Sequence, residues 1–126
     1  SAKPARFDLA TLESLGLIRF TTPTNWTKEP ATFEGVLLSA LLDVVGADPA
    51  ATSLKLTALN DYESPAPIAD GRKLPVMLAL KREGEYMSRR DRGPIWMIYP
   101  QHAYPEVGQR EYLSRWVWQL KAITVE

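Results

Sequence analysis

Few side chains in this sequence could carry out chemistry, and their types limit the reactions available. Among 126 residues there is one histidine, His102, and no cysteine. A Ser–His–Asp mechanism would have to use His102, but no Gly-x-Ser-x-Gly turn is present to expose a serine. Zinc needs several nitrogen or sulfur ligands, and iron–sulfur clusters need thiolates. The sequence therefore argues against a hydrolase, a zinc site and an iron–sulfur cluster.

Charge is unevenly distributed along the chain, although 15 basic and 15 acidic side chains balance. Residues 29–70 contain seven acids and one lysine, a net charge of −6, whereas residues 71–92 contain seven bases and three acids, a net charge of +4. Arg89 and Arg92 lie beside a Gly-Pro turn, where guanidinium groups and free backbone N–H groups could hold an anion such as phosphate. The alternative is a solvated loop that pairs with the acidic stretch. The zero net charge disfavours nucleic acid as a partner.

The aromatic residues and the histidine offer further binding candidates. Trp96 and the terminal segment carrying Trp116 and Trp118 are expected to lie mainly in the core. Trp26 lies among polar loop residues and is the tryptophan expected to meet a ligand or partner. His102 is either a donor to a ligand or an exposed polar residue in a proline-flanked loop.

Two segments that could position these side chains have apolar residues at helical spacing. Asp8 is expected to cap a helix of about two turns that ends at Gly16. From residue 34 to residue 45, leucine and valine recur on one helical face, and Gly46 follows as the residue that would end this helix.

Strands are predicted from β-branched, aromatic and alternating segments, at residues 17–22, 54–59, 76–80 and 95–99. The prolines at positions 65, 67 and 75 predict an irregular stretch before the third of these. Residues 116–125 are expected to form one long strand or two pieces, with Trp116, Trp118 and Leu120 on one face. No apolar run approaches the length of a membrane helix, so membrane insertion is not expected. These elements predict one α+β domain over residues 1–126, with a mixed β-sheet and few helices.

Several short motifs, taken in order, resemble a known family. They are Phe33-Glu34-Gly35-Val36-Leu37-Leu38, Asn60-Asp61-Tyr62, Leu78-Ala79-Leu80, Arg92-Gly93-Pro94-Ile95-Trp96-Met97-Ile98 and Arg115-Trp116-Val117. From about residue 22 to residue 125, the chain resembles the oxidoreductase molybdopterin-binding domain, the catalytic core of the sulfite oxidase family. The resemblance implies the sulfite-oxidase-type α+β fold, with the cofactor held by loops at one side of the sheet. It also implies a bacterial protein that is periplasmic or secreted and acts with a sensor or redox protein.

The chain departs from this family at the metal ligand. The family's enzymes bind molybdenum through a cysteine in a pattern like Cys-x-x-x-Trp, and the corresponding segment here runs from Thr22 to Trp26. A threonine hydroxyl is not a soft, readily ionised ligand. The family's basic residues ahead of the terminal strand are represented only by Arg115, and the enzymes' domain is longer. The resemblance therefore implies a reduced member that keeps the scaffold and has lost part of the active site.

The first functional hypothesis is a non-catalytic binding module for a small anion, a pterin-like molecule or a segment of a partner protein. The alternatives are a molybdenum–molybdopterin oxidoreductase with altered metal ligation and a structural interaction subunit. No catalytic or metal-ligating residue is predicted, and molybdopterin is the one cofactor that the pocket could still take. The residues expected to line the pocket are Thr22, Trp26, Asn60, Tyr62, Arg89, Arg92, His102 and Arg115.

Overall fold

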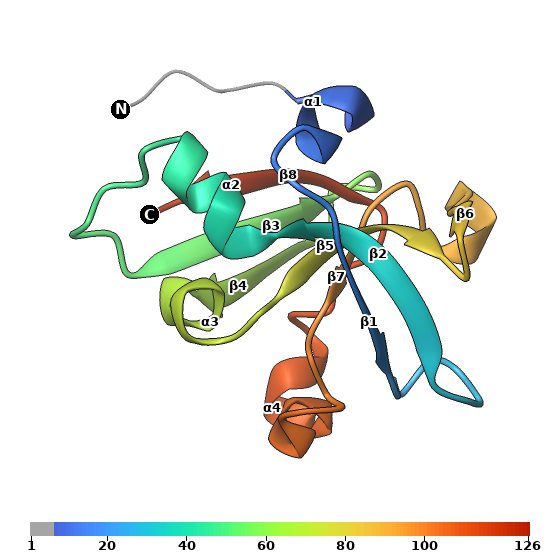
Figure 1. Cartoon of the computed structure of the whole chain (residues 1–126). Helices are drawn as coiled ribbons and strands as arrows, with labels where there is room; N and C mark the ends of the chain where they lie inside the picture. Colours follow the sequence, from blue (N-terminus) through green and yellow to red (C-terminus); the bar gives the residue numbers. More distant parts are fainter. Residues whose placement is uncertain (1–6) are drawn as a thin grey trace.

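Two antiparallel sheets form the framework of the computed structural model, which describes residues 7–126 (Figure 1). The first sheet has the order β1-β2-β5-β6, and β7 also pairs with β5. Its strands are β1 (Ile18–Thr22), β2 (Ala31–Leu37), β5 (Met77–Arg82), β6 (Glu85–Tyr86) and β7 (Trp96–Ile98). The second sheet has the order β4-β3-β8 and consists of β3 (Ser53–Ala58), β4 (Glu63–Pro67) and β8 (Leu120–Val125).

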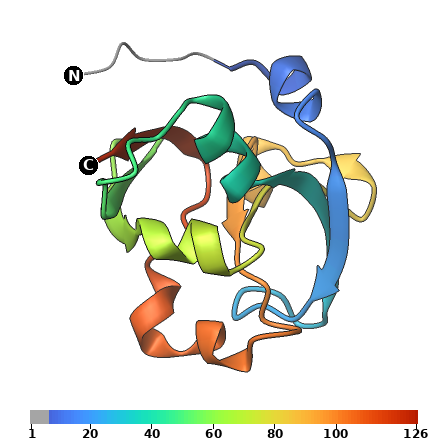
Figure 2. The ribbon, with the colours of Figure 1, turned by 60° about the vertical axis from the view of Figure 1, so that its left-hand side comes forward.

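The helices are short and lie around these sheets. They are α1 (Leu9–Glu13), α2 (Leu38–Val44), α3 (Ile68–Lys73) and α4 (Arg110–Leu113), with 3-10 turns η1 (Arg89–Asp91) and η2 (Pro105–Gly108). Helices α2 and α3 contact each other, while α1 and α4 lie at opposite ends of the molecule (Figures 1 and 2). Among residues 7–126, no helix has the length and apolar character needed to cross a membrane.

The predicted α+β class with few helices is confirmed, and the sheets differ from the expected mixed sheet in one respect. All strand pairs among the described residues are antiparallel. A parallel pair needs a long crossover connection, whereas hairpins such as β1–β2 and β3–β4 join antiparallel neighbours through short loops. Such connections favour the antiparallel arrangement in the pairs β1–β2, β3–β4 and β5–β6, which are neighbours in the sequence.

The main core lies between side chains of both sheets. It includes Phe33 of β2, Leu54 and Leu56 of β3, Met77 of β5 and Trp96 of β7. A smaller cluster packs α1 against the first sheet, through Leu12, Val36 and Leu80. Because β5 is covered on both faces, its first four residues are all buried, which explains the continuous apolar run in its sequence.

The predicted helix over residues 34–45 begins later than expected. Residues up to Leu37 belong to β2, and α2 begins at Leu38. Strand β2 pairs with β1 on one side and with β5 on the other, so sheet hydrogen bonding overrides the helical spacing in this segment. The predicted end is confirmed, because Gly46 has a φ of +65° just after the helix.

The proline-rich stretch is regular, contrary to the prediction. It contains β4 and α3. Strand β4 lies at the edge of its sheet and pairs only with β3, and Pro65 and Pro67 are exposed there, so they remove no hydrogen bond that a second neighbour would need. Pro67 also precedes the first turn of α3.

The terminal segment forms only one strand, β8, because residues 116–119 lie outside any strand, and the predicted common face for its apolar residues is wrong. Trp116 is 1% exposed whereas Trp118 is 38% exposed. Gln119 has a φ of +52°, which interrupts the alternation before β8 begins at Leu120. Because residues 116–119 are not in a strand, the expected alternation does not hold there, and Trp118 lies at the surface beside the pocket described next.

Candidate functional site

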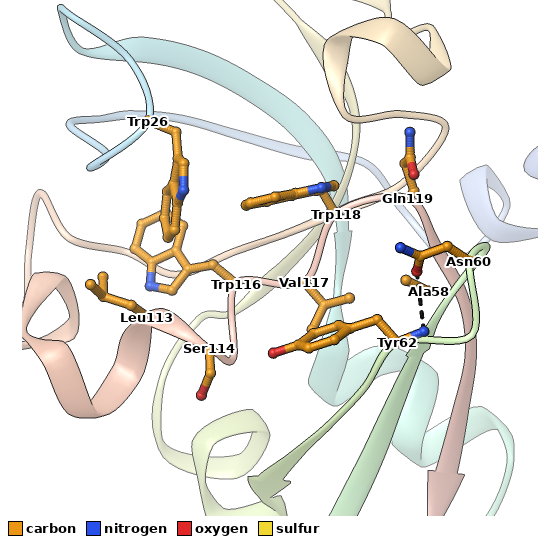
Figure 3. Close-up of a pocket in the computed structure, with 10 residues that line it drawn as sticks. All are labelled: Trp26, Ala58, Asn60, Tyr62, Leu113, Ser114, Trp116, Val117, Trp118 and Gln119. Atoms are coloured by element: carbon orange, nitrogen blue, oxygen red, sulfur yellow. Dashed lines mark hydrogen bonds between the residues drawn. The ribbon is translucent and has the colours of Figure 1, made fainter.

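An aromatic pocket of about 420 Å³ lies between the loop after β1, the β3–β4 turn and the segment that leads from α4 to β8 (Figure 3). None of its lining residues carries a formal charge. They are Trp26, Ala58, Asn60, Tyr62, Leu113, Ser114, Trp116, Val117, Trp118 and Gln119. Among them, the side chains of Trp118 and Tyr62 are 38% and 50% exposed, so a ligand can reach the pocket from solvent.

Three indoles build one wall of the pocket. The ring of Trp26 lies 5.3 Å from that of Trp116 and 5.7 Å from that of Trp118. The indole N–H of Trp116 donates to the carbonyl oxygen of Val107 at 3.0 Å, which fixes the buried ring. No side-chain hydrogen bond is found for the indoles of Trp26 and Trp118 within the described chain. They meet through their ring faces and edges, as aromatic pairs commonly do.

The opposite side of the pocket is set by the β3–β4 turn. The side-chain oxygen of Asn60 accepts the backbone N–H of Tyr62 at 3.1 Å, and Asp61 between them has a φ of +68°. Such an Asx turn fixes the direction in which the chain leaves the strand. Figure 3 shows the rings of Tyr62 and Trp118 on two sides of Val117, with the Tyr62 hydroxyl directed toward the Ser114 side.

Trp26, Asn60 and Tyr62 are thus the predicted residues that line the pocket together. Sequence reasoning missed the contribution of residues 113–119. It assigned Trp118 to the core because strand alternation was expected over residues 116–125, whereas the strand begins only at Leu120.

Thr22 and His102 lie together, but outside this pocket. The Thr22 side chain is fully buried, where its hydroxyl accepts the backbone N–H of His102 at 2.9 Å and donates to the carbonyl oxygen of Pro23 at 3.0 Å. The exposed imidazole of His102 stacks against Phe20, with ring centroids 4.8 Å apart. Neither residue lines this pocket, and the Thr22 hydroxyl holds the end of β1 to the loop after β7.

Arg115 is also outside the pocket lining. Its guanidinium lies 2.9 Å from the carboxylate of Asp70, and their side chains are only 19% and 11% exposed. The hydroxyl of Tyr99 donates to the same carboxylate at 2.8 Å, and burial together with the Asp70 charge raises the pKa of Tyr99 above its ordinary value. Arg115 therefore neutralises a buried acid that sequence reasoning did not connect with it.

Arg89 and Arg92 support the pocket from outside its lining. The carbonyl oxygen of Arg89 accepts the side-chain N–H of Gln119 at 2.8 Å, while the Arg89 side chain is exposed. The Arg92 guanidinium lies over two indole rings, 5.1 Å from the centroid of Trp118 and 5.3 Å from that of Trp96. The basic cluster is therefore not a bare anion cradle, since one member stacks on the pocket wall. The expected pairing of basic and acidic stretches occurs elsewhere, between Arg72 and Asp43.

The residues present do not fit a molybdenum centre. The chain has no cysteine, and the Thr22 hydroxyl is buried with both of its hydrogen-bonding roles filled. Within residues 7–126, no group of three or more His, Asp or Glu side chains is arranged to hold a metal ion. A soft metal centre thus has no protein ligand of the required kind in this part of the chain.

Comparison with known proteins identifies the family of this chain. The model of the family described as "Oxidoreductase molybdopterin binding domain" matches residues 8–125. Among solved structures, the chain is similar to the sulfane dehydrogenase SoxCD from Paracoccus pantotrophus, with a TM-score of 0.71 and 18% identity over 94% of this chain and 34% of that chain. It thus spans about a third of the SoxCD chain, and the likeness at this identity concerns the fold. No curated protein matches the sequence. The chain belongs to the oxidoreductase molybdopterin-binding domain family.

Proposed function

We propose that this domain is a non-catalytic member of its family that binds a flat heteroaromatic ring, such as a pterin, in the aromatic pocket. The observation that carries the proposal is the lining itself, which combines indole and phenol rings with uncharged polar side chains. Ligand sites are commonly apolar cavities of this size class with a few polar groups that set orientation. A flat ring with polar edges matches that combination best.

The two exposed rings define how such a ligand would sit. Trp118 and Tyr62 flank Val117 in Figure 3, so a flat ring entering from solvent would contact aromatic surface on its faces. Stacking of a nucleobase on an aromatic side chain contributes about 1–3 kcal/mol, and it is tolerant of ring type. The amide of Gln119 and the hydroxyl of Ser114 are uncharged groups of the lining that can hydrogen-bond to ring edges.

The absence of charge in the lining separates this proposal from binding of a small anion inside the pocket. Phosphate or sulfate is normally held by guanidinium groups or clustered backbone N–H groups. Arg89, Arg92 and Arg115 do not line the pocket, and Arg115 is engaged by Asp70. Free phosphate or sulfate in the pocket would therefore lose its hydration without gaining a charged hydrogen-bonding partner.

The non-catalytic part of the proposal rests on the missing metal ligand. A hydroxyl that is buried and already hydrogen-bonded on both sides cannot replace a thiolate without rearrangement of the β1 end. A heteroaromatic ring can be held by stacking and a few hydrogen bonds, so its binding does not require a metal ligand.

The proposal is tested by measuring the affinity of pterin for the wild type and for Trp118→Ala by isothermal titration calorimetry. We expect the wild type to bind pterin and the variant to bind it at least roughly tenfold more weakly, because one stacking face is lost. Tyr86→Ala is the matched control, since Tyr86 is 54% exposed on β6 and lies outside the pocket. Equal pterin affinity in all three proteins, or no pterin binding to the wild type, would contradict the proposal.

A further inference from the structure

Arg92 is a cationic side chain that contacts aromatic rings and has no acidic partner in the described part of the chain. Its guanidinium lies against Trp96 and Trp118, and its Nε is buried without a hydrogen-bond partner in the described structure. No carboxylate among residues 7–126 forms an ion pair with it. An unpartnered buried donor on a charged side chain is costly, and in native proteins such groups call for an explanation.

The backbone around Arg92 is held in a strained conformation that is tied to the pocket wall. Arg92 has a φ of +75° and Gln119 has a φ of +52°, and the backbone N–H of Gln119 donates to the carbonyl oxygen of Arg92 at 2.9 Å. The side chain of Gln119 adds a second link to the same loop, at the carbonyl oxygen of Arg89. Two left-handed residues other than glycine therefore meet next to Trp118, and such strain persists only where surrounding contacts hold it.

We propose that Arg92 sets the charge preference of the aromatic pocket, through a guanidinium held against the Trp118 ring. This inference rests on the proposed function, because it concerns the ligand of the same pocket. Arg92 is not part of the lining, so its charge acts across the indole of Trp118. A positive charge at that place favours flat rings that carry a carboxylate or other negative substituent and disfavours cationic rings. The preferred ligand is thus a heteroaromatic ring with a negative substituent. The ring would lie in the pocket, and its substituent would form no direct ion pair with Arg92.

The experiment compares three flat probes that share one bicyclic ring: quinoline carboxylate, quinoline carboxamide and N-methylquinolinium. Their affinities are measured by tryptophan fluorescence quenching for the wild type, Arg92→Met, Arg92→Lys and Arg90→Met. We expect the carboxylate-to-quinolinium affinity ratio to fall roughly tenfold in Arg92→Met relative to the wild type, because one unit charge is removed near the ring. Arg92→Lys should retain most of the wild-type ratio, since it retains the charge.

Arg90→Met is the matched control, because Arg90 lies in the 3-10 turn that directly precedes Arg92, is exposed and makes no cation–π contact among the described residues. Its affinity ratio should equal that of the wild type. A purely structural role for Arg92 would weaken all three probes alike and leave the ratio unchanged, which would overturn the inference. If Arg92→Met does not fold, the carboxylate-to-quinolinium affinity ratio is measured at low and high salt for the wild type and Arg92→Lys. Added salt must lower this ratio if the preference is electrostatic, and a ratio that does not change with salt would overturn the inference.

Failure of this inference can be distinguished from failure of the proposed function. If the probes bind the wild type and are weakened by Trp118→Ala, but Arg92→Met keeps the wild-type ratio, the pocket binds rings and Arg92 does not select their charge. If neither pterin nor any quinoline probe binds the wild type, the proposed function is wrong and the charge preference falls with it.

Discussion

Individual ion pairs in this chain differ strongly in burial, and this difference determines what each contributes. Asp70 accepts from both Arg115 and Tyr99 in a nearly buried cluster, whereas Asp43 pairs with Arg72 at the surface. Breaking a buried pair leaves the remaining charge without solvation or a partner. Exposed pairs contribute little, because water already solvates both groups and salt screens them.

We expect Asp70→Ala to lower the free energy of unfolding by on the order of 3 kcal/mol, since Arg115 and the Tyr99 hydroxyl both lose their shared acceptor. Asp43→Ala is the surface control, and its side chain is 73% exposed, so we expect a change of less than about 1 kcal/mol. Urea unfolding of both variants at neutral pH measures the difference. Equal destabilisation by the two substitutions would show that the Asp70 cluster does not hold α3 to the segment after α4.

Among the elements, the pairing of β2 with β5 decides how the first half of the domain is arranged. The register of this pair shifts between Glu34 and Gly35, where the two strands approach closely. A methyl group at Gly35 would collide with the carbonyl oxygen of Leu78 and the Cα of Ala79. A glycine inside a strand commonly marks such a close backbone approach.

We therefore expect Gly35→Ala to cost roughly 3 kcal/mol or more of stability, because the collision is with backbone atoms that cannot turn aside. Gly46→Ala is the control, since a methyl group there meets nothing within 4 Å and only its φ of +65° is unfavourable. That variant should lose about 1 kcal/mol. Thermal and urea unfolding of the two variants provide the comparison, and a milder effect at Gly35 than at Gly46 would refute the close-approach explanation.

Over the whole molecule, the family scaffold is present without a thiolate for the metal. The structural similarity to SoxCD extends over 94% of this chain but over only 34% of the SoxCD chain. The core and both sheets are formed by residues 7–126 of this cysteine-free chain. Loss of the metal ligand is therefore compatible with a folded domain.

We expect the chain, purified from a host that makes molybdenum cofactor, to contain far less than one molybdenum atom per molecule. The physical reason is the lack of a soft protein ligand, since the Thr22 hydroxyl is buried and occupied. Elemental analysis measures this, with a sulfite-oxidase-type enzyme from the same host as the positive control for cofactor supply. Stoichiometric molybdenum that survives gel filtration would contradict the non-catalytic assignment and favour altered metal ligation.

Features that depend on local spacing or on composition could be predicted without the structure. The capped helix at Asp8, the strands near residues 18, 54, 77 and 96 and the helix end at Gly46 were predicted from patterns a few residues long. The absence of cysteine excluded a thiolate ligand in any fold, and the order of short motifs predicted the family that the comparison confirmed. These properties follow from residue types and need no knowledge of distant contacts.

The tertiary structure alone decided which side chains share a site. Trp26 meets Trp118, Thr22 meets His102 and Asp70 meets Arg115, and each pair joins residues from distant parts of the chain. Sheet pairing also turned residues 34–37 and 63–67 into strands against their local pattern. The physical reason is that long-range hydrogen bonding and burial stabilise these arrangements by more than the local preferences oppose them.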